Sequence, residues 1–332
     1  MTDLSHYIKA KSVVDTYINN YRYLNGTTKK QHFMSRLSLC DGYKNLLTDD
    51  RRKESVFKYI TKDLTKKIDQ SWDELWDESM ENDENGYKKK IKQQDSDDIK
   101  FYFGMNDVLG ETDILLRNGL DLPKGIEKKI NRRYLLKMIE IADNDDIIKD
   151  LEGTTYVNGI GEIICLKKLK NSFAPITWNA INDCYKKMFE YYLDKCEHFE
   201  SWIRNDFKRH NYIYGLTHCI INLTNFYTES IQNNDLYFTY IKRTILCLKN
   251  ILKYCKRDNY SLLNNDTLAE ILLTMKLCGA EYENERMSAL DLLSLRFDPT
   301  KHIFREHKFD SFKDEIIKNE HTNILYILNV LL

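Results

Sequence analysis

The sequence predicts an all-α protein built from stacked helical hairpins of about 52 residues. Apolar residues recur at helical spacing along most of the chain, as Val13, Val14, Tyr17 and Tyr21 do near its start. Glycine and proline number only 12 and 3, where average usage would give about 23 and 17. Alternating apolar and polar residues bounded by turns, the pattern of β-strands, are nearly absent.

Composition narrows the classes of partner. Hydrophobic residues make up 42% of the 332-residue chain and charged residues 30%, which excludes wholesale disorder. Lys and Arg total 50 against 51 Asp and Glu. Because this balance gives no bulk attraction to anionic polymers or lipids, we expect neither a nucleic-acid partner nor a membrane partner.

The expected compartment is the cytoplasm. The first residues show no basic segment followed by an apolar stretch, the pattern of a signal peptide. No apolar run approaches the roughly 18 residues of a membrane span. The eight cysteines include no Cys-x-x-Cys pair and mostly occupy apolar helical patterns, so we predict reduced, buried thiols.

Changes in composition suggest three regions. Residues 1–80 form an N-terminal helical region, and residues 81–98 form a charged linker or loop. Residues 99–332 form the helical-hairpin repeat, either as a separate domain or as one continuous domain with 1–80. The helices predicted in the first region are Leu4–Tyr23, His32–Leu47 and Arg51–Ile68.

The repeat is visible as a polar residue that precedes an aliphatic run, with successive intervals of 51, 56, 52 and 51 residues. A small residue lies just upstream in the first four cases. We expect each polar residue in the first turn of an inner helix, followed by a loop and an outer helix. The five polar residues are Glu111, Glu162, His218, Glu270 and His321.

Glycine and proline fit the same repeat. Gly119 and Gly279 follow Glu111 and Glu270 at the distance where a helix would end, and glycine is the preferred residue after a helix C-terminus. Pro123 lies where the next helix would begin. Six hairpins of this length would fill the chain, and six is the number that closes an α/α toroid. An open solenoid is the alternative.

The C-terminal part carries a resemblance to a known fold. An inner helix at Leu268–Cys278, an outer helix at Glu285–Leu295, a return loop beginning Arg296-Phe297-Asp298-Pro299 and a terminal helix from His321 follow one another. This order resembles the hairpin unit of the terpenoid cyclase and prenyltransferase-β class, over about the last 220 residues. The resemblance implies an α/α toroid. Neither the glycine-rich return loop nor the aspartate-rich motif of that class is present, so it implies no catalytic residue.

If the ring closes, the five polar residues meet near one mouth of its axis. We predict that His218, Glu270 and His321 bind a divalent metal (Zn, Mn or Fe), because imidazole and carboxylate suit all three. We expect their side chains within roughly 10 Å of one another, the reach of a site with one or two metals. A structural interpretation remains open, because Glu is also favoured in the first turn of any helix.

The predicted catalytic residues are Glu111, Glu162 and Tyr214. The carboxyl groups would act as acid and base, and the phenol of Tyr214 would supply a proton or line the pocket. Familiar nucleotide-binding motifs are absent, so no nucleotide cofactor is expected. His302 and His307, in the return loop, are further candidates that could cap the cavity.

The sequence is compatible with three functions. The first is a toroid enzyme, metal-assisted, that acts on a small molecule or peptide in an axial cavity. The second is a non-catalytic helical-repeat module that binds a peptide or protein; the pair Trp72 and Trp76, at i, i+4 spacing, would dock on the bundle or on such a partner. The third is a glycosidase or lyase that uses paired glutamates.

Overall fold

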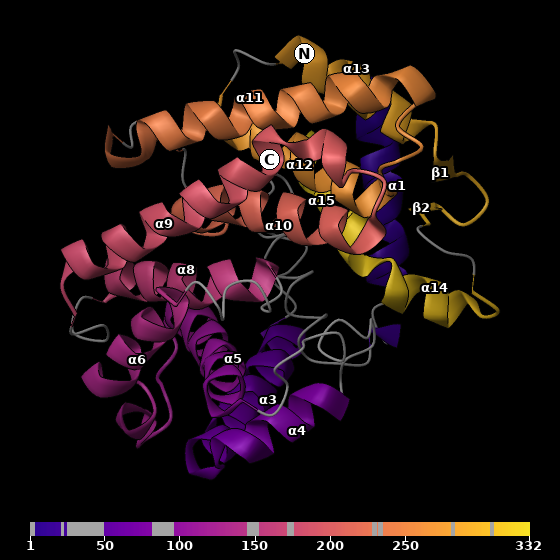
Figure 1. The fold of residues 1–332 in the computed structure, drawn as a ribbon. Helices are drawn as coiled ribbons and strands as arrows, with labels where there is room; N and C mark the ends of the chain where they lie inside the picture. The colour runs from indigo at the N-terminus through magenta and orange to yellow at the C-terminus, as the bar shows by residue number, and fades with distance from the viewer. Residues whose placement is uncertain are drawn as a thin grey trace. The chain divides into compact units, whose positions relative to one another are not determined.

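The computed structural model shows an all-α protein (Figure 1). It describes residues 4–20, 23–24, 50–81, 96–144, 153–170, 176–227, 231, 235–279, 283–305 and 309–332. Within these ranges the strands are β1 (Phe297–Asp298) and β2 (Ile303–Phe304), an antiparallel pair in which Phe297 faces Phe304. The predicted fold class is therefore confirmed as all-α, with no sheet larger than two short strands in the described part.

The chain divides into two compact units. The first unit combines Met1–Val56, Phe199–Asp206 and Tyr227–Leu332, and the second combines Phe57–His198 and Phe207–Phe226.

The second unit is organised around α5 and α8, which pack along each other. Both are apolar on most sides: α8 is buried at nearly every position from Gly153 to Lys167. Helices α4, α6 and α9 pack against this pair. The helices of this unit are α3 (Asp50–Asp69, from Phe57 onward), α4 (Trp72–Glu81), α5 (Asp97–Arg117), α6 (Arg132–Ala142), α8 (Gly153–Leu169), α9 (Trp178–Glu197) and α10 (Asp206–Leu223, from Phe207 onward).

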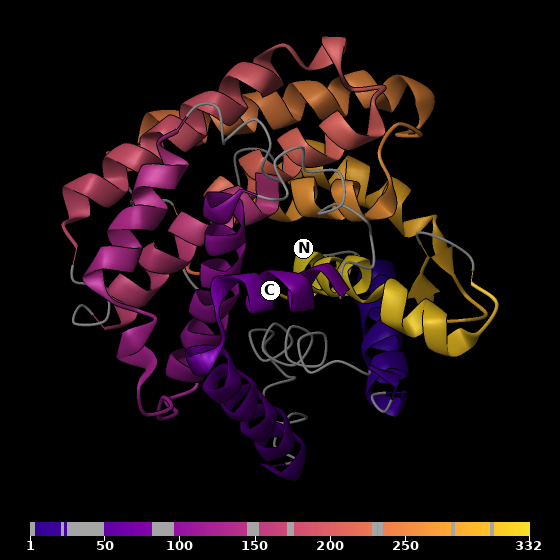
Figure 2. The same cartoon turned by 60° about the horizontal axis from the view of Figure 1, so that its bottom comes forward.

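The first unit is organised around α12 and α15, which lie side by side in Figure 1. The N-terminal helix α1 packs against α15, and in Figure 2 the yellow C-terminal segment lies beside the indigo α1. Buried His6 of α1 contacts the Tyr326 hydroxyl of α15 at 3.0 Å. The helices of this unit are α1 (Leu4–Asn19), α11 (Phe238–Cys255), α12 (Asn265–Leu277), α13 (Glu283–Ser294), α14 (Phe312–Lys318) and α15 (Glu320–Leu331).

Buried and amphipathic helices alternate along the repeat region. Helices α5, α8, α10, α12 and α15 have apolar residues on most sides, whereas α6, α9 and α11 bury a single face. A helix that is hydrophobic all round needs neighbours on every side, and an amphipathic helix covers it from outside. This is the order of inner and outer helices that the repeat predicts.

The two predicted helix-ending glycines are confirmed. Gly119 follows the C-terminus of α5 with φ 68°, and Gly279 follows that of α12 with φ 116°. Both angles lie in the left-handed region, which a residue with a Cβ enters only at a cost. The sequence therefore marks these two helix ends correctly.

Other predictions fall partly outside the described residues. The predicted helix His32–Leu47 and residues 82–95 of the predicted linker lie there. At the edges of that segment, Glu81 ends α4 and Asp97 begins α5. The division into 1–80, 81–98 and 99–332 therefore stays a prediction. His307 and Cys40 are outside the described residues as well.

The tryptophan pair of α4 docks on the second unit itself. Trp76 is 5% exposed and packs edge-on against Phe103, with ring centroids 5.2 Å apart. Trp72 packs against Phe101 at 4.8 Å, and the ammonium of Lys129 lies over its ring at 3.9 Å. The two rings therefore serve intramolecular packing, which removes one argument for a partner surface.

The described cysteines are free thiols, all buried except the partly buried Cys278. Burial raises the pKa of Cys184 and of Cys278 to about 12, so both remain protonated near neutral pH. Among the helices that the structure describes, none has both the length and the apolar character required to cross a membrane.

Candidate functional site

Four of the five repeat residues lie outside the first turn of their helices. Glu111, Glu162 and His218 lie in the second halves of α5, α8 and α10, which begin at Asp97, Gly153 and Asp206. The predicted position was wrong for these three. It was also wrong for Glu270, which lies one turn further into α12, and it is right for His321, in the first turn of α15.

The small residues upstream explain the error. A Cβ added to Gly161 would collide with Asn222 of α10, and one added to Gly215 would collide with the ring of Tyr192 of α9. These glycines lie inside helices, where they let a neighbouring side chain approach the backbone. The sequence shows only a glycine before a polar residue, which is also typical of a helix start.

The predicted site residues are divided between the two units. Glu111, Glu162, Tyr214 and His218 belong to the second unit, whereas Glu270 and His321 belong to the first. The predicted approach of His218 to His321 therefore stays a prediction.

In the first unit, Glu270 and His321 lie close together and a third residue, Asp266, joins them. Asp266 Oδ1 lies 2.8 Å from His321 Nδ1. The other ring nitrogen, Nε2, lies 4.0 Å from Glu270 Oε2. The imidazole of His321 thus lies between two carboxyl groups, one on each of its nitrogens.

Local helix chemistry positions this cluster. Asn264 caps α12 by accepting a hydrogen bond from the Thr267 N–H at 2.7 Å, which places Asp266 in the first turn and Glu270 one turn later, on the same face. His321 opens α15, which packs along α12. The side chains of His321, Asp266 and Glu270 are 35%, 18% and 0% exposed. The cluster therefore runs from the surface of this unit into its core.

The contacts of Asp266 indicate which nitrogen of His321 carries the proton. Thr322 Oγ1 donates to Asp266 Oδ1 at 2.9 Å, the oxygen that also faces His321. An ionised carboxylate only accepts hydrogen bonds, so Nδ1–H of His321 donates to it. In the neutral imidazole this leaves the lone pair on Nε2, which faces Glu270. This arrangement can take up a proton at Nε2.

A second polar cluster lies in the second unit and is far less accessible. The Arg117 Nε–H donates to Asp113 Oδ2, and Nη1 donates to the Asn225 carbonyl at 2.8 Å. Asp113 is 3% and Glu162 8% exposed, and Asp113 Oδ1 and Glu162 Oε2 have no hydrogen-bond partner in the described part of the chain. Burial raises the pKa of both carboxyl groups, and the negative charge of Asp113 raises that of Glu162 further.

Glu111 belongs to a separate ion-pair group between α5 and α3. Its carboxylate binds Lys67, whose ammonium also lies 3.0 Å from Asp63 Oδ2. Burial raises the pKa of Glu111 to about 8, while the Lys67 ammonium acts in the opposite direction. Glu111 therefore pairs with Lys67 of α3. Glu162 lies near the preceding residue of α5 instead: its Oε1 is about 3.8 Å from the position that a Cβ on Gly110 would take.

Tyr214 and His218 form part of a ring stack along α10. The ring of Tyr214 lies 4.1 Å from that of His210 and 6.2 Å from that of His218, measured between centroids. His218 Nδ1 contacts Asn158 Oδ1 at 2.8 Å, and both Tyr214 and His218 are buried. The His218–Asn158 contact ties α10 to α8, and the ring of Tyr214 is packed between two histidines of its own helix.

No group of three or more His, Cys, Asp or Glu side chains suited to hold a metal ion occurs among the described residues. Glu270 and His321 supply two groups of the ligand types that first-row metals prefer. Whether His218 joins them stays a prediction, and so does the metal.

The structure adds two acidic residues, Asp266 and Asp113, that the repeat in the sequence does not single out. Asp266 precedes Glu270 by four residues, so both lie on one face of a helix, and this spacing was available as a sign. Asp113 and Arg117 have the same spacing on α5. Neither pair stands out, because i, i+4 pairs of polar residues are common on ordinary exposed helices.

Comparison with models of protein families, with curated proteins and with solved structures found no match to this chain.

Proposed function

We propose that the protein is an enzyme that uses general acid–base catalysis at the Asp266–His321–Glu270 cluster. The observation that carries the proposal is the 2.8 Å contact of Asp266 with His321 Nδ1, which orients Nε2 toward Glu270. A histidine held by a carboxylate through one nitrogen and reachable at the other is the usual arrangement of a catalytic base.

Each residue has a separate role in this proposal. His321 Nε2 takes a proton from the substrate or from a water, and Asp266 stabilises the resulting imidazolium and fixes the ring. Thr322 holds Asp266 in place through its hydroxyl. Glu270, 0% exposed and 4.0 Å from Nε2, favours the charged imidazole when it is ionised and can receive its proton.

The proposal also includes a bound metal, a closed ring of helices and a cytoplasmic location, as the sequence predicts. A divalent metal bound by Glu270 and His321 would give the metal-assisted form, with Asp266 orienting the imidazole as a carboxylate behind a metal-bound histidine does. The α/α toroid, with a small molecule or peptide in its cavity, is the arrangement favoured by the alternation of buried and amphipathic helices. A cytoplasmic location is also proposed on the sequence alone.

The test is a panel of chromogenic esters, glycosides and phosphoesters, assayed with the full chain. We expect turnover in one class that falls at least about 100-fold in His321→Gln and in Asp266→Asn, the usual contribution of an acid–base group. His198→Gln is the control, because His198 is an exposed histidine outside the cluster. Far-UV circular dichroism checks that every variant keeps its helices.

Two results would contradict the proposal. One is the absence of turnover above the uncatalysed rate for every class, and the other is full activity in His321→Gln. A chelator arm separates the two forms of the mechanism: loss of activity that returns with one added metal favours the metal-assisted form.

A further inference from the structure

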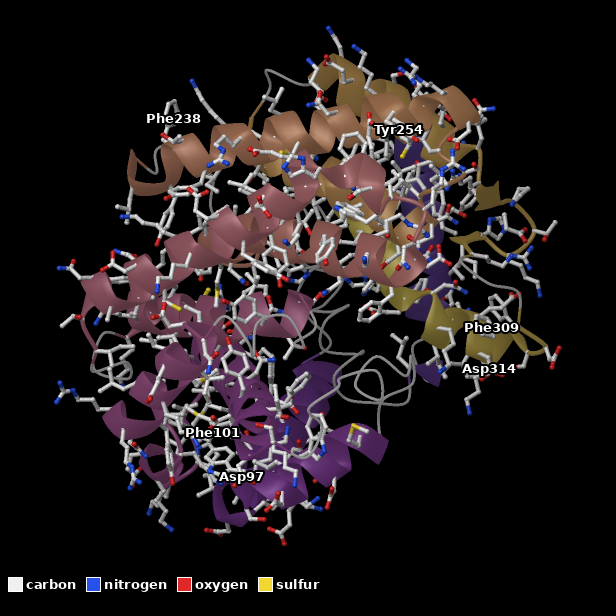
Figure 3. The ribbon with its side chains drawn as sticks, viewed as in Figure 1. Asp97, Phe101, Phe238, Tyr254, Phe309 and Asp314 are labelled. Carbon is white, nitrogen blue, oxygen red and sulfur yellow. The ribbon has the colours of Figure 1, made fainter. Side chains whose placement is uncertain are left out.

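The second unit contains a pocket whose lining residues belong to neither of the two polar clusters described above. Its volume is about 640 Å³, and it borders one face of α6 and the first turn of α5. Figure 3 labels Asp97 and Phe101 at this end of α5. The pocket is lined by Asp98, Arg132, Arg133, Leu136, Lys137, Glu140, Ile141 and Asn144.

The pocket offers apolar surface at its middle. Leu136 is 40% exposed, although leucine is among the residues most often buried, and Ile141, which also lines the pocket, is 3% exposed. The opposite face of α6 buries Leu135 and Met138 in the unit. The exposed leucine is therefore not needed for the packing of α6, and a ligand could cover it.

The cations of the pocket are of two kinds. Lys137 is fixed: its ammonium lies 2.9 Å from Asp98 and 4.8 Å from the ring centroid of Phe101. Arg132 and Arg133 form no hydrogen bond or ion pair within the part of the chain that the structure describes. Two guanidinium groups are thus available to a ligand, while the charge of Lys137 is already balanced by Asp98.

The acidic residues of the pocket do not cancel these arginines. Asp98 is paired with Lys137, and Glu140 lies about two helical turns from Arg132 along α6. The arginine end of the pocket therefore carries an unbalanced positive charge.

We propose that this pocket binds a small organic anion, with its carboxylate, sulfonate or phosphate at Arg132 and Arg133 and its apolar body against Leu136. Arginine pairs recognise such planar or tetrahedral anions through two parallel hydrogen bonds. A volume of about 640 Å³ matches the range of roughly 300–1,000 Å³ typical of small-molecule sites. The proposal does not depend on the Asp266–His321–Glu270 cluster, which belongs to the other unit.

The experiment titrates the full chain with 1-anilinonaphthalene-8-sulfonate, an aromatic sulfonate whose fluorescence rises on binding. We expect saturable binding that weakens at least about tenfold in the double variant Arg132→Gln/Arg133→Gln, which loses two charged hydrogen-bonding groups. Leu136→Ala should weaken it by a smaller factor. The matched control is Arg204→Gln/Arg257→Gln, which removes the same charge from exposed positions outside the pocket.

Competition identifies the chemistry of the ligand. Benzoate should displace the probe at lower concentration than inorganic phosphate, because only benzoate carries an apolar body. The proposal is overturned if the wild-type chain shows no saturable binding, if the Arg132→Gln/Arg133→Gln variant binds as the wild type does, or if the control variant weakens binding equally. Displacement by phosphate but not by benzoate would overturn the role of Leu136.

Discussion

In the first unit, the imidazole of His321 is flanked by two carboxyl groups and its side chain is 35% exposed. In the second unit, the guanidinium of Arg117 binds Asp113 and acts on Glu162 through its charge, and the two carboxyl residues are only 3% and 8% exposed. Both clusters combine carboxyl groups with one basic side chain, and both lie on buried inner helices. They differ in access, in the identity of the base and in charge balance.

The difference in base decides what each cluster can do. Imidazole changes its protonation near neutral pH, so a histidine that substrate can reach is suited to proton transfer. Guanidinium keeps its proton, so Arg117 can only balance charge. Burial deprives a charged group of its hydration, so we expect substitutions in the second cluster to change the stability of the protein. We expect substitutions in the first cluster to change its activity.

The largest expected effect is a loss of stability when the cluster of Asp113, Arg117 and Glu162 in the second unit is disrupted. Replacing Arg117 by Met keeps an unbranched side chain but leaves the buried carboxyl group of Asp113 without the guanidinium that it binds. We expect the free energy of unfolding to fall by about 3 kcal/mol or more, as for other buried ion pairs that lose one partner. Urea unfolding measures it. A fall of less than about 1 kcal/mol would show that the cluster is hydrated and not truly buried.

The next largest effect is a dependence of the free energy of unfolding on pH. Burial raises the pKa of Glu162 well above its ordinary value of 4.5, so above pH 4.5 the folded chain holds a proton that the unfolded chain releases. The free energy of unfolding should then fall as pH rises through this window, by up to about 1.4 kcal/mol per pH unit for one group. Glu162→Gln keeps a neutral side chain and should remove this part of the slope.

Unfolding free energies at several values between pH 5 and pH 8 test this. Part of the slope should remain in Glu162→Gln, because burial also raises the pKa of Asp113 and, to about 8, that of Glu111. Glu127→Gln, at an exposed position of the same unit, is the control and should keep the full wild-type slope. An unchanged slope in Glu162→Gln would mean that Glu162 is ionised in the folded chain.

The smallest expected effect concerns the first cluster. His321→Gln removes one hydrogen bond to Asp266 from a side chain that is 35% exposed, so we expect a loss of about 1 kcal/mol or less. The same substitution should abolish the proposed activity. A large loss of stability in thermal and urea unfolding would instead place His321 among the structural residues and remove the contrast between the clusters.

The sequence predicts helices and helix ends correctly where residues within one helix determine them. Gly119 and Gly279 end helices in the predicted places because a left-handed residue after a helix is a local requirement. The helices at Leu4–Asn19 and Asp50–Asp69 follow from apolar spacing alone. The predicted helix starts before Glu162 and His218 were wrong, because Gly161 and Gly215 upstream allow close contacts with other helices.

Only part of the candidate site could be found in the same way. The repeat register singled out Glu270 and His321, which do lie together, but it also singled out Glu111, which pairs with Lys67 of α3. It missed Asp266 and Asp113, because their partners His321 and Glu162 are distant in sequence.

The sequence by itself determined the helical class, the alternation of buried and amphipathic helices and the two glycine-capped ends, because these depend on residues within a few positions of one another. The tertiary structure decided which polar residues are reachable, which carboxyl group meets an imidazole and which meets a guanidinium. Exposure and charge pairing depend on residues brought together from distant helices, so neither can be read from a single stretch of the chain.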